Sequence, residues 1–239
     1  MAVALSTRSL RIDFGGLPAV DDVSFDVVEG EILGLIGPNG AGKTTLFNLV
    51  SGYLRPSGGQ VHLRGRDVTG MPPWALARLG VSRTFQVVRP FPRLTVLGNV
   101  AVGAYLHHRS RPDAERAAAE ILRFLGMERI AAVEAGSLTL PSRKRLEIAR
   151  ALAVEPRLLL LDEVVAGLNP AEVEEIIALV RRIRERGVTI VIVEHIMRVI
   201  MGLSDRVVVL NYGRKIADGS PAAVAADPGV IAAYLGEDD

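Results

Sequence analysis

The sequence has no cysteine, almost no net charge and no long apolar run. Without cysteine the chain has no disulfide, no thiolate metal site and no cysteine nucleophile, which is compatible with a reducing compartment. The 28 Lys and Arg residues balance 27 Asp and Glu, and a formal net charge of +1 gives no electrostatic argument for nucleic acid or an anionic membrane. The apolar runs are far shorter than the roughly 20 residues that cross a bilayer. We therefore expect buried strands and no nucleic-acid partner.

The length of the chain bears on its number of domains, and its first residues bear on its cellular compartment. A chain of 239 residues can bury a sizeable core as one large domain. Residues 1–14 lack the basic region, the sustained apolar stretch and the small-residue cleavage site of a signal peptide. We expect a domain that stays in the cytosol.

Apolar runs typical of buried strands alternate with longer helical patterns. The strand-like runs cover residues 31–36, 158–161, 188–193 and 206–210, and helical patterns cover residues 43–50 and 170–186. Near-continuous apolar strands that alternate with helices are typical of a parallel sheet covered on both faces. The sequence therefore predicts an α/β fold with a mainly parallel sheet.

Two further parts of the chain depart from this alternation. Residues 10–14, 23–28 and 60–63 have the pattern of a small antiparallel layer, whereas residues 95–152 have a helical pattern. We expect a single domain over residues 1–239. In it, residues 1–94 and 153–239 form the core with an antiparallel β subdomain, and residues 95–152 form an inserted helical subdomain.

A glycine-rich loop follows the first strong strand and precedes a helix. Residues 37–44 match GxxxxGK[ST], in which backbone N–H groups converge on phosphate oxygens, Lys43 reaches the β- and γ-phosphates and Thr44 offers a hydroxyl to Mg²⁺. The order of strand, loop and helix argues against a chance glycine turn, and the helix adds its positive dipole end. We expect ATP and Mg²⁺ as ligands. The residues expected at the nucleotide are Gly37, Pro38, Asn39, Gly40, Ala41, Gly42, Lys43, Thr44 and Thr45.

A pair of acidic residues follows the run of four leucines at residues 158–161. A P-loop needs a second acidic site for its metal, and Asp162 at the carboxyl end of a buried strand is expected to support Mg²⁺. Glu163 would then lie near the γ-phosphate, where it can polarise an attacking water as general base. An Asp-Glu dipeptide alone is commonly a solvated acidic pair at a strand end. The P-loop in the same chain favours the interpretation that the pair serves the metal and the catalysis.

The order of these and two further motifs resembles that of ATP-binding cassette (ABC) ATPases over essentially the whole chain. Gln86 follows Arg83, Thr84 and Phe85 between the P-loop and the acidic pair, and His195 closes the apolar run at residues 188–193. The resemblance implies a RecA-like P-loop NTPase core. It also implies that Gln86 contacts Mg²⁺ or water, and that His195 faces the γ-phosphate. A lone histidine is more often structural, but its place at a strand end favours the functional role.

The resemblance assigns two further places at the nucleotide. Phe14 stands where the family stacks an aromatic ring on adenine, although composition alone would place it in the core. The family signature LSGGQ falls on residues 138–142, just before an expected helix at residues 145–153. In the family this segment of one chain covers the γ-phosphate bound by another, which implies that Thr139 and Ser142 contact the nucleotide of a partner chain.

Proline at position 141 departs from the signature. It replaces a glycine whose N–H is a phosphate donor, and proline has none. Losing one such donor can lower a rate by a factor on the order of 10²–10³. The basic residues 143–145 either compensate or form an ordinary solvated first turn. Two readings follow: an ATPase, or a nucleotide-gated binding module that hardly hydrolyses ATP.

Several short segments of the sequence resemble one branch of the family. Residues 14–20, 83–86, 166–170 and 234–236 are similar to ATP-binding subunits of branched-chain amino acid importers. The ATP-binding subunits of urea and amide importers and the lipopolysaccharide export ATPase are similar to it in many of the same segments. The resemblance implies a second cassette, identical or not, and a membrane permease docked near Gln86 and residues 87–100. It places the chain at the cytoplasmic face of the membrane through that permease, with the solute bound elsewhere.

Overall fold

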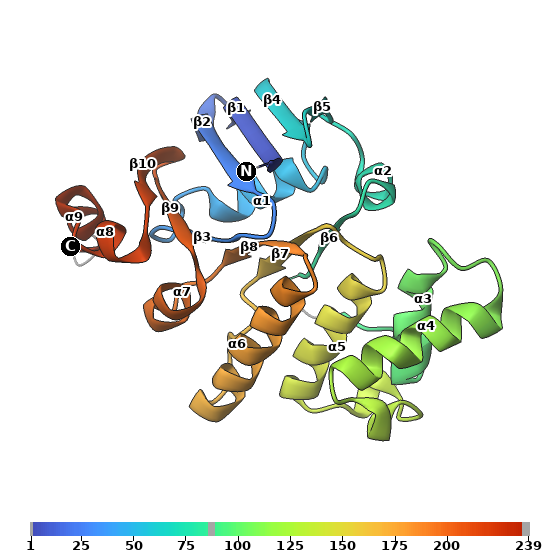
Figure 1. The fold of residues 1–239 in the computed structure, drawn as a ribbon. Helices are drawn as coiled ribbons and strands as arrows, with labels where there is room; N and C mark the ends of the chain where they lie inside the picture. Colours follow the sequence, from blue (N-terminus) through green and yellow to red (C-terminus); the bar gives the residue numbers. More distant parts are fainter. Residues whose placement is uncertain (1, 86–88, 236–239) are drawn as a thin grey trace.

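A six-stranded sheet forms the centre of the computed structural model, which describes residues 2–85 and 89–235 (Figure 1). The strand order is β10-β9-β3-β8-β7-β6, and all neighbours are parallel except β10, which is antiparallel to β9 at one edge. The strands are β3 (Ile32–Ile36), β6 (Val81–Arg83), β7 (Leu158–Asp162), β8 (Thr189–Val193), β9 (Arg206–Asn211) and β10 (Arg214–Gly219). Every residue of β3, β7 and β8 is buried, as expected of parallel strands covered on both faces.

A second, antiparallel sheet covers one side of this core. Its order is β2-β1-β4-β5, formed by β1 (Val3–Phe14), β2 (Leu17–Val28), β4 (Gly58–Leu63) and β5 (Arg66–Asp67). The helix α1 (Lys43–Val50) packs between the two sheets, where Leu46 and Phe47 join Leu5, Phe25 and Leu35 in one buried apolar cluster. The antiparallel layer is therefore part of the same core that supports the P-loop.

Helices cover the opposite face of the central sheet (Figure 1). There α5 (Leu140–Leu152), α6 (Pro170–Glu185) and α7 (Met197–Leu203) share a second buried cluster with the other face of β3, β7 and β8. The remaining helices are α2 (Pro73–Arg78), α3 (Val96–Ala104), α4 (Arg111–Phe124), α8 (Pro221–Ala225) and α9 (Pro228–Leu235), with short 3₁₀ turns at Glu128–Ile130 and Ala135–Ser137.

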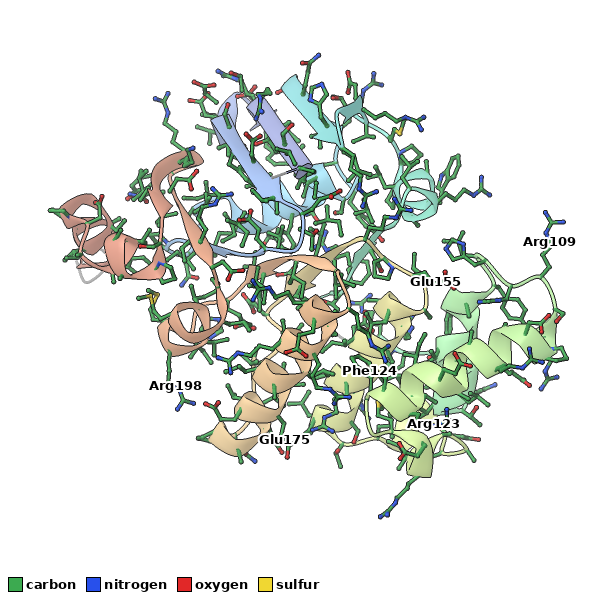
Figure 2. The ribbon with its side chains drawn as sticks, viewed as in Figure 1. Arg109, Arg123, Phe124, Glu155, Glu175 and Arg198 are labelled. Carbon is green, nitrogen blue, oxygen red and sulfur yellow. The ribbon has the colours of Figure 1, made fainter. Side chains whose placement is uncertain are left out.

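The helices of residues 95–152 form a layer beside the core and contact it through α4 and α5. Phe124 at the end of α4, labelled in Figure 2, lies beneath the guanidinium groups of Arg182 and Arg186, at 4.6 and 3.5 Å from its ring centroid. Arg182 lies in the last turn of α6 and Arg186 is its C-cap residue, so cation–π contacts join the helical layer to the core. Among the described residues, no helix is both long and apolar enough to cross a membrane.

The expected α/β architecture is confirmed, with differences at the element boundaries. The helix expected at residues 145–153 begins at Leu140, because Pro141 occupies the first turn, where its missing N–H has no intrahelical partner to lose. The short strand β6 and the antiparallel edge strand β10 are absent from the expectations. β6 has three residues, and β10 carries exposed polar side chains, so neither has the apolar run that marks the central strands.

Substituting alanine at two glycines of the P-loop should separate backbone strain from steric clash. At Gly40 (φ +74°) a Cβ atom would meet nothing within 4 Å, whereas at Gly37 (φ +151°) it would lie 2.1 Å from the carbonyl oxygen of Leu210 on β9. We expect Gly40→Ala to lower the free energy of unfolding by about 1–2 kcal/mol and Gly37→Ala by about 3 kcal/mol or more. Urea unfolding followed by circular dichroism measures both, and equal losses would contradict the contact with β9.

Candidate functional site

Four parallel strands deliver the expected site residues to one edge of the central sheet. The P-loop follows β3, Glu163 follows β7, His195 lies two residues after β8, and Thr84 and Phe85 follow β6. The carboxyl ends of parallel strands meet at the same edge, which is where open α/β sheets bind their ligands. Strand register places Asp162 opposite Val193, so the acidic pair and Glu194 lie on adjacent strands.

The P-loop forms the wall of a cavity of about 290 Å³. Three glycines at positive φ bend the loop around Lys43, whose Nζ donates to the carbonyl oxygens of Gly37 at 2.6 Å and Pro38 at 2.7 Å. The cavity is lined by Ala19, Asn39, Gly40, Ala41, Gly42, Lys43, Thr44, Thr45 and Glu163. The structure therefore brings the P-loop and the expected general base to one cavity.

The two described residues expected at the metal also share a cavity, of about 440 Å³. Thr44 and Asp162 both line it, together with Arg83, Phe85, Arg89, Glu147 and Arg150. Mg²⁺ commonly takes one or two carboxylates, a hydroxyl, phosphate oxygens and water. One carboxylate and one threonine hydroxyl beside a phosphate loop fit this donor set. Gln86, the third expected ligand, lies outside the described residues.

Arg83 is the cation that compensates Asp162. Its Nη2 donates to Asp162 Oδ2 at 2.9 Å, and the two side chains are only 8% and 3% exposed. Its other donors reach Asn48 and Ser51 on and after α1. Burial raises the pKa of the Asp162 carboxyl, and the hydrogen bond and charge of Arg83 oppose that rise. No local sequence pattern indicates this role of Arg83, because its partner Asp162 lies 79 residues away.

Aromatic rings enclose the same guanidinium. Arg83 Cζ lies 5.2 to 5.7 Å from the ring centroids of Phe47, Tyr53 and Phe85, and Tyr53 and Phe85 meet edge to face. Thr84 Oγ1 also accepts the Asp162 amide at 3.0 Å. The segment that leads to Gln86 is therefore bonded directly to Asp162, the residue expected at the metal.

Glu163 occupies a conformation that the rest of the site must hold. Its φ is +47°, in the left-handed region, which costs an L-residue about 1–2 kcal/mol. Its amide donates to the carbonyl oxygen of Val193 at 3.0 Å, and its own carbonyl oxygen accepts Lys144 Nζ at 2.7 Å. The backbone of the expected general base is thus fixed on both sides, by β8 and by α5.

A second carboxylate, Glu194, lies buried beside it. Glu194 is 1% exposed, and its Oε1 accepts the amide of Val165 at 3.0 Å. Its Oε2 has no hydrogen-bond partner among the described residues, and burial raises the pKa of this carboxyl to about 7. The signal in the sequence is an acidic residue that closes a strand of apolar residues directly before His195.

The remaining expected residues that the structure describes line neither of these two cavities. His195 is exposed, and Phe14 is half exposed at the tip of the β1–β2 hairpin rather than in the core. Thr139 caps α5 and donates to Ser142 Oγ at 3.2 Å, and neither lines the P-loop cavity of its own chain. Thr139 and Leu140 at the start of α5 are exposed, so another molecule can reach them.

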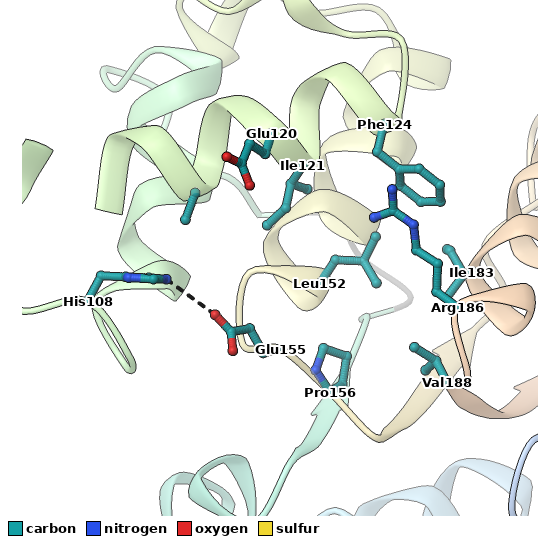
Figure 3. A pocket seen from close by; sticks show the side chains of 11 residues that line it. His108, Glu120, Ile121, Phe124, Leu152, Glu155, Pro156, Ile183, Arg186 and Val188 are labelled. Carbon is teal, nitrogen blue, oxygen red and sulfur yellow. Dashed lines mark hydrogen bonds and ion pairs between the residues drawn. The ribbon is translucent and has the colours of Figure 1, made fainter. Parts of the chain in front are cut away.

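A cavity of about 480 Å³ lies elsewhere, between α4, α5 and α6 (Figure 3). A hydrogen bond of 3.2 Å between His108 Nε2 and Glu155 Oε1 closes one side. Pro156 and Val188 line it just before β7 and β8, so it opens at the amino ends of the parallel strands. Because open α/β sheets bind ligands at the carboxyl ends, this cavity is not part of the nucleotide site.

Arg83→Met should be strongly destabilising, because it leaves the buried Asp162 carboxylate without its cation. Removing one partner of a buried pair costs about 3–5 kcal/mol. The double variant R83M/D162N removes the stranded charge and should recover part of that loss. Urea unfolding without nucleotide measures the stability of wild type, Arg83→Met and R83M/D162N. An Arg83→Met variant as stable as wild type would contradict the account.

Glu194→Gln should flatten the pH dependence of stability. The pKa of Glu194 is raised above its usual value of 4.5 to about 7, so its contribution to stability is present below about pH 4.5 and lost as the pH rises through 7. Between about pH 5 and pH 8 the free energy of unfolding of wild type should fall by roughly 1–3 kcal/mol relative to the variant. Urea titrations of both proteins at the two pH values test this. If the free energy of unfolding changes equally with pH in wild type and variant, the prediction is contradicted.

Comparison with known proteins identifies the family of the chain. Residues 20–166 match the family model of the ABC transporter, and residues 214–239 match that of the branched-chain amino acid ATP-binding cassette transporter. The chain is 41% identical to the high-affinity branched-chain amino acid transport ATP-binding proteins BraF of Pseudomonas aeruginosa and LivG of Escherichia coli. Each alignment covers 98% of this chain and 98% of the relative.

Solved structures agree with the fold. A nucleotide-free ATP-binding cassette from an ABC transporter superposes with a TM-score of 0.90 at 31% identity, over 98% of this chain and 99% of that one. A cassette in its ADP conformation gives 0.90 at 32% identity over 99% of both chains. A dimeric post-hydrolysis cassette bound to ADP and Pi gives 0.81 at 25% identity, over 91% of this chain and 98% of that one. The chain belongs to the ABC transporter family, as an ATP-binding domain homologous to those of branched-chain amino acid transport.

Proposed function

We propose that this chain binds and hydrolyses Mg·ATP and so drives a membrane permease that imports branched-chain amino acids. The observation that carries the proposal is the common cavity of the P-loop and Glu163 beside the shared cavity of Thr44 and Asp162. Phosphate recognition, a metal carboxylate and a base are the parts that phosphoryl transfer to water needs.

Each residue has a role in the proposed reaction. The P-loop amides and Lys43 bind the phosphates, and Phe14 stacks on adenine from the β1–β2 hairpin. Thr44 and Asp162 would hold Mg²⁺, with Gln86 as a further ligand, and the metal supplies charge neutralisation at the phosphates. The Glu163 carboxylate takes a proton from the attacking water, while His195 faces the γ-phosphate.

The site is half of a composite one under this proposal. Thr139 and Ser142 stand at the exposed start of α5, away from the P-loop cavity of their own chain. A second cassette, identical or related, would present this turn to the γ-phosphate, and the dimeric ADP-bound relative supports such an arrangement. The positive end of the helix α5 dipole favours a phosphate there.

The permease would dock on the surface beside residues 89–95. Asn99 is fully buried and holds this segment through four hydrogen bonds, to both backbone groups of Phe91 and to the carbonyl oxygens of Leu94 and Thr95. Phe91 remains 45% exposed beneath Arg150. An ordered segment with an exposed ring suits a docking surface better than a mobile loop does. Such docking would place the chain at the cytoplasmic face of the membrane.

The proposed solute is supported by the names of the relatives and by the carboxyl-terminal family match, while the solute itself would bind to other subunits. A transport assay with the complete transporter, comparing radiolabelled leucine with urea and short amides, tests this assignment. Uptake of urea or amide without leucine would overturn the choice of solute and leave the ATPase intact.

Glu163→Gln should abolish turnover while nucleotide binding persists. Removal of a general base lowers rates by about 10²–10⁴, and the uncharged glutamine should let an ATP-bound dimer accumulate. Phosphate release and sedimentation in Mg·ATP measure the two effects. Unchanged turnover together with no ATP-stabilised dimer would contradict the proposed function.

Pro141 motivates the other function, a nucleotide-gated binding module with little hydrolysis. In the structure it occupies the first turn of α5 without breaking the helix, so the turn can still present its remaining donors. We expect Glu163-dependent hydrolysis by wild type and at most a modest gain from Pro141→Gly. A wild type that closes on ATP but does not hydrolyse it would favour the binding module.

A further inference from the structure

Lys144 connects the signature helix of the chain to the backbone of its own general base. It lies in α5, two residues after Ser142, and is 5% exposed. Its Nζ donates to the carbonyl oxygen of Glu163 at 2.7 Å. Burying an ammonium is costly unless hydrogen bonds and opposite charges compensate for lost water. A lysine in this place therefore calls for a reason beyond packing.

The surroundings of Lys144 supply the compensating charge. Burial lowers the pKa of its ammonium, and the carboxylates of Glu194, Glu163, Asp162 and Glu147 oppose that shift. Glu194 leads this group, and its Oε2 has no partner among the described residues. Lys144 and Glu194 thus hold opposite sides of the loop after β7: one bonds the Glu163 carbonyl and the other the Val165 amide.

The contact acts on a residue that needs to be held. Glu163 has φ +47°, and a non-glycine residue persists in this region only when its surroundings fix it. The Val193 carbonyl fixes its amide side, while Lys144 and the weaker 3.3 Å contact from the Ala166 amide fix its carbonyl side. Without the ammonium the following peptide can rotate, and the carboxylate loses its direction.

The helix makes this contact sensitive to what happens at its start. Thr139 and Lys144 are five residues apart, about 7.5 Å along a helix, and a single helix moves as a rigid rod over that length. Leu140 also lies against the loop after β7: a Cβ atom on Gly167 would come within 3.0 Å of its Cδ2. A displacement of the first turn of α5 therefore reaches the Glu163 backbone of the same chain.

We propose that Lys144 is a positioning residue that fixes the backbone of Glu163 and makes the general base of one nucleotide site depend on the α5 helix that serves the other. The inference rests on the proposed ATPase function. It assigns Lys144 no contact with the nucleotide. Its loss should therefore reduce kcat and leave ATP affinity and KM nearly unchanged.

The test uses Lys144→Met in the purified protein or the assembled transporter. Loss of one charge-assisted hydrogen bond should lower kcat about 10- to 100-fold, with KM and the affinity for a fluorescent ATP analogue within about twofold of wild type. Lys215→Met makes the same chemical change at a lysine paired with Asp218 on β10, and should leave kcat unchanged. Wild-type kcat in Lys144→Met would overturn the proposal.

The absence of cysteine from the natural chain allows a matched chemical control. Lys144→Cys is unfolded, labelled through a disulfide with either an aminoethyl or a propyl group, and refolded. The two labelled forms differ from each other only in the terminal group, which is an ammonium in one and a methyl in the other. We expect the aminoethyl form to recover most of the lost kcat and the propyl form to recover none, with both returning to low activity after reduction. Equal recovery by the two forms would assign Lys144 to packing and overturn the positioning role.

A double-mutant cycle tests the dependence on α5. If Thr139 and Lys144 act along one helix, the loss of kcat in T139A/K144M should be smaller than the product of the two single losses. Strictly multiplicative losses would overturn the linkage. If wild type itself shows no Glu163-dependent hydrolysis, the proposed function fails, and this proposal fails with it. Active wild type with active Lys144→Met overturns this proposal alone.

Discussion

The negative charge that β7 and β8 bring to one edge of the sheet is the constraint on which the site depends. Asp162 and Glu194 are 2% and 1% exposed, and Glu163, which follows Asp162, has a φ in the left-handed region. Carboxylates taken out of water must be paired, hydrogen bonded or protonated. Asp162 is paired by Arg83, and the Val165 amide and a raised pKa accommodate Glu194.

This compensation also determines which parts of the molecule are joined. Arg83 comes from β6 and bonds the end of α1, so the strand leading to Gln86 and the P-loop helix meet at the Asp162 carboxylate. Lys144 comes from α5 and bonds the backbone of Glu163, the proposed general base. The two cations beside the acidic edge therefore connect it to the segment proposed to face the permease and to the helix α5 proposed to serve a second cassette.

The sequence predicts the parts of this site whose chemistry is local. The P-loop, Asp162 and Glu163 each follow a recognisable strand, and the structure places them at adjoining cavities. Arg83 and Lys144 were missed as charge partners, because their contacts span 79 and 19 residues and depend on strand order. The helix α5 begins five residues before the expected start at residue 145, because Pro141 belongs to its first turn and not to the segment before it.

The proposal that each site is shared between two chains is tested most directly by mixing two inactive variants. Lys43→Ala removes the lysine side chain that is proposed to bind the phosphates, and Thr139→Arg blocks the first turn of α5. In a mixed dimer one site carries both defects and the other carries none, because each site takes its P-loop and its α5 turn from different chains. The account predicts that the mixture regains ATPase activity well above that of either variant alone. A mixture as inactive as its components would contradict it.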